Sequence, residues 1–464
     1  MSVDLRLTGG TVITPQGPVV SDLVVHGGKI VGIIDPSLGL VAERTVDVNG
    51  KLVLPGMVDV HVHTREPGYT HKEDIRTTTE QAAAGGVTTI FGMPNLEPPT
   101  TDTETLGSVF AMYAKNSIVD YNHNPAPTKE HEILGMAAMG IRAYKIYMVV
   151  DTGRTYPHPA GTGMHDHGHL LRIMDHIAKT GLRFIVHPHD QALMDYIEGA
   201  YLERGENTPQ GYAQAYAERN GVIWDTAIDV VLRLAEAANC PVHIAHMQTA
   251  RSIDAVRRAK ARGVDVTCEV NHWAPFLSTW NDVETLGPYA LSYWVPDDAR
   301  EAVWEGMRDG TIDIASSDHA PHTREEKEIG WTEMWSAHTG TPGIQYYYPL
   351  MLDAVNRGEI SLERVVEMVA SKPAEAFGLS GVKGELQVGA DADIAIADMD
   401  SQWTITNEGV LSRVGWTPYD GRSISARIDR TFVRGHEVFA DGAVVGKPGF
   451  GKLAAAGQKK EGTR

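Results

Sequence analysis

The sequence predicts an α/β fold: a TIM-type (β/α)8 barrel with a small β-sandwich domain built from both chain termini. Two observations predict it. Between about residue 52 and residue 317, short β-branched apolar runs alternate with stretches of helical periodicity, which is the pattern of repeated β/α units around a parallel sheet. The two ends of the chain instead show only short alternating runs between Gly, Pro and Asn, which is typical of a small β domain.

The predicted barrel strands and helices follow one another at regular spacing. Strands are expected at 52–62, 87–93, 117–123, 141–148, 182–188, 241–246, 264–269 and 312–317. Helices are expected to follow most of them, among them Glu73–Ala84, Leu170–Lys179, Ile223–Ala238, Ser252–Ala261 and Asp297–Asp309. In such a barrel the catalytic residues lie at the carboxyl ends of the strands. Residues that follow the apolar runs are therefore the first candidates for a site.

The domain boundaries follow from the same change of pattern. Residues 1–51 and 384–450 are assigned to the β-sandwich, and residues 52–383 to the barrel. The last stretch, 451–464, is rich in Ala, Gly and Lys and is expected to be a flexible or docking tail.

Composition and charge exclude several classes of partner. The chain of 464 residues has 41 basic and 60 acidic residues and a formal net charge of −19. Nucleic acids and anionic membranes need a clustered basic surface, so neither is expected as a partner. No run of 18 apolar residues occurs, and Cys240 and Cys268 stand in apolar contexts that favour buried free thiols over a disulfide. These features predict a cytoplasmic enzyme that acts on a small molecule.

Six residues that can bind a metal ion follow the β-branched runs. They are His61, His63, Lys145, His187, His246 and Asp318. His61 and His63 are two residues apart on a strand, so both side chains point to the same face. A lone buried histidine is more often a hydrogen-bonded core residue. The whole set instead predicts a catalytic metal site, because imidazole and carboxylate ligands suit zinc and related divalent ions.

Two of these residues allow two interpretations from the sequence alone. Lys145 is either an ion-paired or snorkelling cation, or an amine whose pKa is lowered by burial and which has reacted with carbon dioxide. The carbamate formed in that way would offer two oxygens to a pair of metals. Asp318 is either the N-cap of a helix or a metal ligand that also accepts a proton from bound water. No periodic helical run directly follows it.

Five motifs give the chain a resemblance, over nearly its full length, to the cyclic amidohydrolases of the amidohydrolase superfamily (dihydroorotase, allantoinase and hydantoinase). They are Pro55-Gly-Met-Val-Asp-Val-His-Val-His63, Ala84-Gly-Gly-Val-Thr-Thr89, Met93-Pro-Asn95, Asp318-His-Ala-Pro-His322 and Gly389-Ala-Asp-Ala-Asp393. The resemblance implies a hydrolase that opens a cyclic amide or ureide ring by attack of metal-bound hydroxide. It also implies a homodimer or homotetramer.

The resemblance implies roles for the individual residues. His61, His63, Asp318 and a carbamylated Lys145 would hold one divalent ion, usually zinc, and Lys145, His187 and His246 would hold a second. Asp318 would also carry a proton to the departing ring nitrogen. Arg65, Asn95 and His322 match dihydroorotase residues that contact the substrate, Arg65 and Asn95 through its carboxylate.

The identity of the ring substrate stays open at this stage. His63-Thr-Arg-Glu-Pro-Gly68 favours a dihydroorotase-like, carboxylate-bearing substrate, with hydantoinase and allantoinase as alternatives. The loop Ser292–Asp297, His189 and the aromatic residues Trp335 and Tyr346–Tyr348 depart from the dihydroorotase pattern. Residues 151–169, rich in histidine, are expected to form a lid or a solvated loop. A non-catalytic dihydropyrimidinase-like scaffold is the rival from another class, but such relatives lose metal ligands, and all six are present here.

Overall fold

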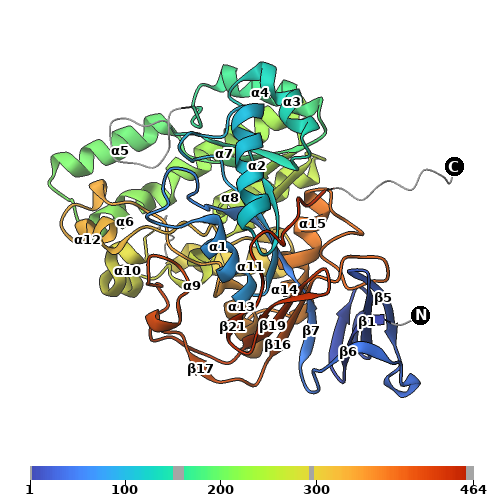
Figure 1. The fold of residues 1–464 in the computed structure, drawn as a ribbon. Helices are drawn as coiled ribbons and strands as arrows, with labels where there is room; N and C mark the ends of the chain where they lie inside the picture. Colours follow the sequence, from blue (N-terminus) through green and yellow to red (C-terminus); the bar gives the residue numbers. More distant parts are fainter. Residues whose placement is uncertain (1–2, 150–160, 292–296, 456–464) are drawn as a thin grey trace.

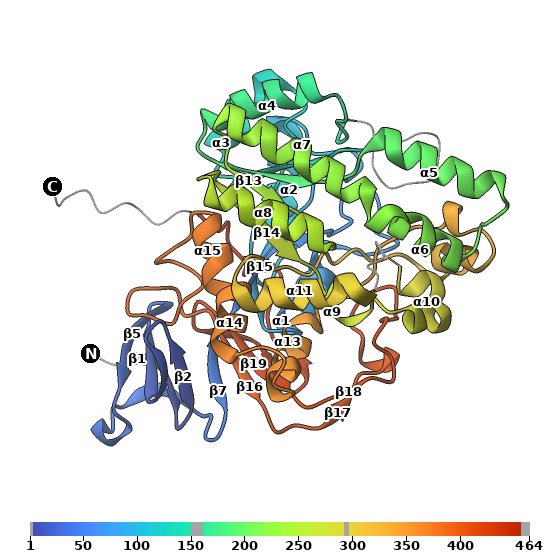
Figure 2. The ribbon, with the colours of Figure 1, turned by 180° about the vertical axis from the view of Figure 1, so that it is seen from behind.

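The computed structural model describes residues 3–149, 161–291 and 297–455. Its strands form one parallel group, surrounded by helices, and a second group of mixed sheets (Figures 1 and 2). Figure 1 shows the strands of the N-terminal segment beside those near the C-terminus, so the two ends of the chain meet in space.

The parallel group has eight strands in two sheets. One sheet has the order β10–β9–β8, and the other runs from β11 through β12, β13 and β14 to β15. Every neighbouring pair in both sheets is parallel. In chain order their bounds are Met57–Val62, Val87–Gly92, Asp120–His123, Ala143–Tyr147, Arg183–His187, Val242–Ile244, Val266–Val270 and Ile314–Ala315.

The two parallel sheets meet along two seams, one between β8 and the segment after β15, and one between β11 and the segment after β10. Backbone contacts join the sheets at both seams. At one seam Val62 of β8 bridges His319 in parallel, and His63 N donates to His319 O at 2.8 Å. Buried Asp59 strengthens this seam, because its Oδ1 accepts from the backbone N of Ser317 at 3.1 Å. At the other seam Lys145 N donates to Pro125 O at 3.0 Å. The carboxyl ends of β8 and β15 therefore lie side by side.

The predicted strand 52–62 is wrong in one respect, because it is two strands in different sheets. Leu52–Pro55 forms β7, which pairs with β16 in the β domain, and β8 begins only at Met57. Gly56 separates them. A Cβ at this position would lie 2.2 Å from the side chain of Thr88, so only glycine permits the close approach of β8 to β9.

Several helices begin directly after a residue whose side chain caps the first turn. Asp74, Asp166 and Thr249 each accept a backbone N–H at the start of α1 (Ile75–Ala84), α4 (His167–Ala178) and α8 (Ala250–Ala261). With α7 (Val222–Ala238) and α11 (Asp297–Asp309), these confirm the five predicted helices to within three residues at each end. Among the described residues, no helix is both long enough and apolar enough to cross a membrane.

The remaining helices lie in the connections. They are α2 (Thr103–Asn116), α3 (Ile133–Ala138), α5 (Gln191–Glu203), α6 (Pro209–Ala217), α9 (Trp273–Phe276), α10 (Trp280–Leu286), α12 (Arg324–Glu328), α13 (Tyr347–Asn356), α14 (Leu362–Val366) and α15 (Lys372–Ala376). Tyr347 and Tyr348 of α13 donate to Val270 O and Pro55 O at 3.0 and 3.4 Å. These two tyrosines therefore pack α13 against β14 and β7.

Both ends of the chain contribute to the β domain. Its four-stranded sheet has the order β5–β4–β1–β6, and its seven-stranded sheet the order β21–β20–β19–β16–β7–β2–β3. An apolar cluster that includes Leu7, Val25, Val53, Ile394 and Phe432 contains residues of both sheets. The bounds not yet given are β1 Val3–Thr8, β2 Thr11–Thr14, β3 Gly17–Val20, β4 Asp22–His26, β5 Lys29–Ile34, β6 Ala42–Asp47, β16 Ile394–Asp398, β19 Arg427–Val433, β20 His436–Ala440 and β21 Ala443–Val444, with β17 Trp403–Thr404 and β18 Ser423–Ile424 forming a separate pair.

A buried ion cluster ties the β domain to the parallel strands. Lys383 Nζ lies 2.5 Å from Asp120 Oδ2 of β10, 2.9 Å from Asp391 Oδ2 and 2.6 Å from Asp393 Oδ2. Lys383 is 3 % exposed, and Arg434 also pairs with Asp120. The acidic residues of the Gly389–Asp393 motif therefore serve a structural role in this fold.

The start of the C-terminal segment docks on β10. Tyr121 N donates to Lys452 O at 3.0 Å, and Ala454 N donates back to Tyr121 O at 2.7 Å. Asn122 Nδ2 also donates to Ala454 O at 2.9 Å. Residues 451–455 thus run beside β10 like a short parallel strand, whereas 456–464 lie outside the described residues.

Candidate active site

His61, His63 and Asp318 converge where β8 meets the segment after β15. Asp318 Oδ1 lies 3.2 Å from Nε2 of each histidine. One ligand atom from each of the three residues lies within 4.8 Å of the others, and all three side chains are buried. The prediction that both histidines point to the same face is confirmed. Two imidazoles and a carboxylate are a donor set that suits zinc.

A second layer of polar residues orients these histidines. His61 Nδ1 contacts Glu269 Oε1 of β14, and the other oxygen of Glu269 lies 3.1 Å from His243 Nε2. His63 Nδ1 lies 2.7 Å from Asn95 Oδ1. Partners of this kind fix which ring nitrogen faces a metal and raise its basicity. Asn95, predicted to contact the substrate, therefore contacts a predicted metal ligand.

Glu269 is the site residue that sequence reasoning missed. It lies fully buried in β14, and its side-chain contact with His61 spans 208 residues of sequence. Burial alone would raise the pKa of Glu269, but His61 and His243 hold it well below its usual range. A carboxylate inside the apolar run Val266–Val270 was the available signal.

We expect Glu269→Gln to weaken zinc binding by about 10- to 100-fold, because His61 loses the carboxylate that orients it. Competition between the protein and a chromogenic chelator would measure the change. Glu284→Gln, on the exposed side of α10, is the matched control and should bind zinc like the parent protein. Equal zinc affinity in Glu269→Gln and its parent would show that Glu269 does not support His61.

Lys145, His187 and His246 face the same region from β11, β12 and the segment after β13. The His246 ring centroid lies 4.5 Å from that of His187 and 5.4 Å from that of His61. In the register of β11 and β12, Lys145 pairs with Ile185, and Tyr147 pairs with His187. The structure thus brings the six predicted ligands to one end of the parallel strands.

The Lys145 side chain is one of the buried residues of β11. Its Nζ is fully buried and forms no hydrogen bond with any residue that the structure describes. Burial lowers the pKa of Lys145 to about 8, although the Glu269 and Asp318 carboxylates oppose the shift. An unpartnered buried ammonium is costly, whereas a neutral amine can react with carbon dioxide. His61, His63 and Asp318 therefore form a candidate site for a divalent ion, and the buried Lys145 amine lies near it.

Three site residues have left-handed backbone conformations. The φ angles are 61° at Arg65, 46° at His246 and 47° at Asp318. For residues other than glycine this costs about 1–3 kcal/mol each and persists only where the surrounding structure imposes it. Such strain concentrates at functional sites, and here it aims the side chains that follow the strands.

Arg65 and His322 lie together beside these residues. Arg65 Nη2 is 3.0 Å from His322 Nε2, and Arg65 Nε donates to Pro321 O at 3.2 Å. Arg65 is only 2 % exposed, and within the described part of the chain it forms no ion pair with a carboxylate. A buried guanidinium fork without an anionic partner is suited to bind the carboxylate of a ligand.

His189 lies between the predicted metal ligand His187 and a cluster of aromatic side chains. Its Nδ1 lies 3.3 Å from His187 Nε2, and its ring centroid lies 4.0 Å from that of Trp224. The cluster continues through Tyr216 and Tyr212 to Trp335, whose ring centroid is 5.0 Å from that of Tyr212. A buried aromatic cluster therefore packs against the His187 side of the site.

The histidine-rich segment divides into two parts. Thr162 and Met164 are hydrogen-bonded to Tyr147 of β11, and His167 and His169 lie in the first turn of α4. His158 lies outside the described residues, as do Ser292–Pro296 of the altered loop. The lid prediction for 151–169 therefore remains a prediction.

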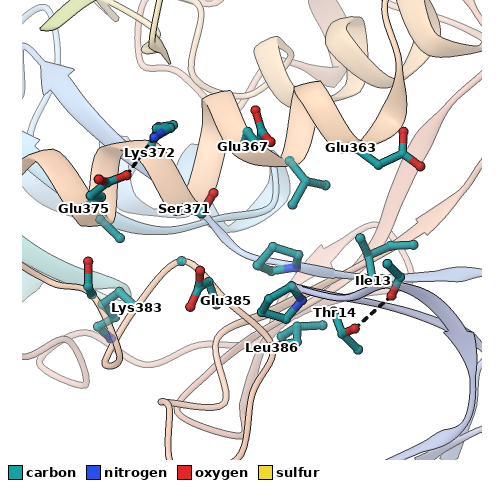
Figure 3. Close-up of a pocket in the computed structure, with 17 residues that line it drawn as sticks. Ile13, Thr14, Glu363, Glu367, Ser371, Lys372, Glu375, Lys383, Glu385 and Leu386 are labelled. Atoms are coloured by element: carbon teal, nitrogen blue, oxygen red, sulfur yellow. Dashed lines mark hydrogen bonds and ion pairs between the residues drawn. The ribbon is translucent and has the colours of Figure 1, made fainter. Parts of the chain in front are cut away.

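A cavity of about 520 Å³ lies away from the predicted ligands, between the β domain and α14–α15. Figure 3 shows Glu363 and Glu367 on one side and Glu385 on the other. Glu367 pairs with Arg364 at 2.7 Å, and Glu375 pairs with Lys372 at 2.8 Å. The cavity holds none of the predicted site residues.

Comparison with known proteins places the chain in a family. Residues 52–438 match the amidohydrolase family. An L-hydantoinase of Paenarthrobacter aurescens is 31% identical, with 97% of each chain covered. A dihydroorotase of Halobacterium salinarum is 33% identical over 92% of this chain and 94% of its own, and an allantoinase of Rubrobacter xylanophilus is 33% identical over 96% of both. The solved L-hydantoinase (dihydropyrimidinase) from Arthrobacter aurescens has a TM-score of 0.93 at 29% identity, covering 98% of this chain and 100% of its own. The chain therefore belongs to the amidohydrolase family and, within it, to the cyclic amidohydrolases.

Proposed function

We propose that this protein is a binuclear-metal hydrolase that opens a carboxylate-bearing cyclic amide or ureide ring, in the manner of a dihydroorotase. The observation that carries the proposal is the Arg65 guanidinium. It is buried beside the converging ligands and lacks a carboxylate partner among the described residues. A ring that carries a carboxylate would satisfy this charge and be held in one orientation.

The metal ligands of this proposal are those predicted from the sequence. His61, His63, Asp318 and a carbamylated Lys145 would hold one ion, and Lys145, His187 and His246 the other. Two bound divalent ions, zinc first among them, would supply Lewis acidity that activates water and polarises the ring carbonyl. The orphaned Lys145 amine and the convergence on Asp318 support this assignment.

Asp318 is the residue that would move the proton. Burial alone would raise its pKa, but the neighbouring His61, His63 and His246 side chains hold the pKa of Asp318 well below its usual range. The carboxylate is therefore charged at neutral pH and can accept a proton from water and deliver it to the departing ring nitrogen. Arg65 would orient the ring, and because the activated water supplies the attacking oxygen, the reaction requires no nucleophilic side chain.

The proposal also includes the architecture of the chain, a (β/α)8 barrel with a β-sandwich. The two seams between the parallel sheets support a closed (β/α)8 barrel, and the apolar cluster between the other two sheets supports a β-sandwich built from residues 1–51 and 384–450. The β7 strand would join the sandwich although it follows residue 51. We keep the expectation of a cytoplasmic homodimer or homotetramer, which sedimentation of the purified protein would test.

Substituted hydantoins are the second candidate substrates. The aromatic cluster beside His187 and His189 favours them, because it would accommodate an apolar ring substituent. The TM-score of 0.93 with a solved L-hydantoinase supports the same alternative. Allantoin, the substrate class named by a relative of equal identity, has no separate support in the geometry.

Arg65→Met separates the two candidates. With zinc and bicarbonate supplied, we expect the parent protein to hydrolyse L-dihydroorotate with kcat/KM of about 10⁴ M⁻¹s⁻¹ or more. Arg65→Met should lower that value by about 10²- to 10³-fold, since one partner of a buried charge pair is removed. Hydrolysis of a neutral hydantoin should change little, and Arg76→Met, an exposed residue of α1, should match the parent on both substrates. Turnover of hydantoin but not dihydroorotate by metal-loaded parent protein would overturn the carboxylate assignment.

A further inference from the structure

A network of buried lysine side chains lies next to the contact between Arg65 and His322. Lys72, from the segment between β8 and α1, is 3 % exposed, and Lys327 of α12 is fully buried. Lys327 Nζ donates to the backbone oxygens of His338 and Gly340 at 2.8 and 3.0 Å, which fixes that loop. Lys72 instead ends between two side chains, His322 and Glu326.

His322 lies at the centre of this network. Its Nε2 is 3.0 Å from Arg65 Nη2, and its Nδ1 is 3.1 Å from Lys72 Nζ. Lys72 Nζ also lies 2.8 Å from Glu326 Oε1, and Glu326 Oε2 is 3.5 Å from His322 Nδ1. The His338 ring stacks on His322 with centroids 4.7 Å apart. The Lys72 amine thus lies within 3.1 Å of two members, His322 and Glu326, of a group that His338 completes.

The donors and acceptors around His322 restrict its tautomer. A guanidinium can only donate, so the contact with Arg65 requires a lone pair on Nε2. A neutral imidazole then carries its proton on Nδ1, which faces Lys72 and Glu326. Burial lowers the pKa of His322 well below its usual value, with Arg65 and Lys72 acting in the same direction, so the neutral form prevails. Only an acceptor beside Nδ1 satisfies this tautomer.

We propose that Lys72, together with Glu326, is a positioning residue that holds His322 as the Nδ1–H tautomer and thereby aims the Arg65 guanidinium at the substrate. Lys72 has no contact with the predicted metal ligands in the described part of the chain, so it acts through His322. The effect expected on turnover rests on the proposed function, since Arg65 is the proposed carboxylate-binding residue.

The chemistry of the Lys72 side chain fits this role. Burial and the nearby Arg65 charge lower the pKa of Lys72 to about 8, with Glu326 opposing the shift. Above about pH 8 the amine is therefore mostly uncharged, and an uncharged amine accepts one hydrogen bond and donates others, so it can accept from Nδ1–H and donate to Glu326. An ammonium can only donate, and would leave Nδ1–H to Glu326 alone.

The tautomer itself is the first test and needs no substrate. In zinc-loaded protein labelled with ¹⁵N-histidine, the His322 resonances, assigned by their loss in His322→Gln, should show a protonated Nδ1 and an unprotonated Nε2. A protonated Nε2 would overturn the proposal. This readout remains decisive even if the protein fails to hydrolyse any carboxylate-bearing ring, which would refute the proposed function alone.

Kinetics with L-dihydroorotate at pH 9, where the Lys72 amine is mostly uncharged, are the second test. Lys72→Met should raise KM about tenfold with kcat nearly unchanged, because one orienting hydrogen bond is lost. Lys72→Gln should stay close to the parent, since its amide can accept from Nδ1–H and donate to Glu326. His71→Ala, whose exposed ring touches the same Glu326 at 3.8 Å, is the matched control and should leave KM unchanged.

Two outcomes would contradict the positioning role. An unchanged KM in Lys72→Met would show that the contact is without effect. An equal rise in Lys72→Met and Lys72→Gln would show that the lysine acts by its charge. If Lys72→Met does not fold, Lys72→Arg replaces it, because arginine can only donate and should raise KM where Lys72→Gln does not.

Discussion

Lys145→Met is expected to lose both metal ions and to lower hydrolysis by about 10³-fold or more, since metal-ion catalysis is worth several kcal/mol. Lys145 is the one predicted ligand shared by both ions, and methionine of similar length fills its buried position without an amine. Elemental analysis of the purified variant and hydrolysis rates would be measured together. The loss should occur without a large fall in folded protein, because the Lys145 amine makes no hydrogen bond among the described residues.

Bicarbonate provides an internal control for this experiment. Zinc uptake by the metal-free parent protein should rise with added bicarbonate, because the carbamate requires carbon dioxide, and Lys145→Met should not respond. Lys115→Met, on the exposed side of α2, should behave like the parent. Two zinc ions per chain in Lys145→Met would refute the carbamate bridge.

Lys383→Met is expected to destabilise the protein by about 3–5 kcal/mol, because it removes the cation that three carboxylates share and leaves Asp393 unpaired, while Arg434 and Lys29 still pair with Asp120 and Asp391. Lys383 Nζ contacts Asp120, Asp391 and Asp393 within 2.9 Å, and the side chain is almost fully buried. The free energy of unfolding in urea would measure the change. Circular dichroism would follow the whole chain in the same titration.

Lys372→Met is the matched control for this prediction. Lys372 also pairs with a carboxylate, Glu375, at 2.8 Å, but both side chains are substantially exposed. Such a surface pair is worth at most about 1 kcal/mol. Similar stabilities for Lys383→Met and Lys372→Met would mean that the buried cluster does not hold the β domain to the parallel strands.

The sequence predicted the positions of the parallel strands and of the six ligand candidates because both depend on local pattern. Apolar runs mark the strands, and parallel strands bring the residues that follow them to one end. The division of 52–62 into β7 and β8 could not be read in this way, since it depends on the approach of Thr88 to Gly56 across the sheet.

The contacts between distant segments were likewise beyond the sequence. Glu269 contacts the His61 ring from another strand, and Asn95 contacts the His63 ring. Lys72 gave no signal of its own, because its role depends on His322 and Glu326, 250 or more residues later. Tertiary hydrogen bonds of this kind produce no periodic pattern in the sequence.

The seam between β8 and β15 has a consequence for the order of assembly during synthesis. Asp59 and Ser317, which join across it, are 258 residues apart, and the triad of His61, His63 and Asp318 spans the same gap. A nascent chain therefore holds two histidines long before the carboxylate that completes the triad is made. Any ion that needs all three ligands stabilises only a chain in which β8 and the segment after β15 have come together. Metal capture would then favour chains whose last parallel strand has docked beside the first.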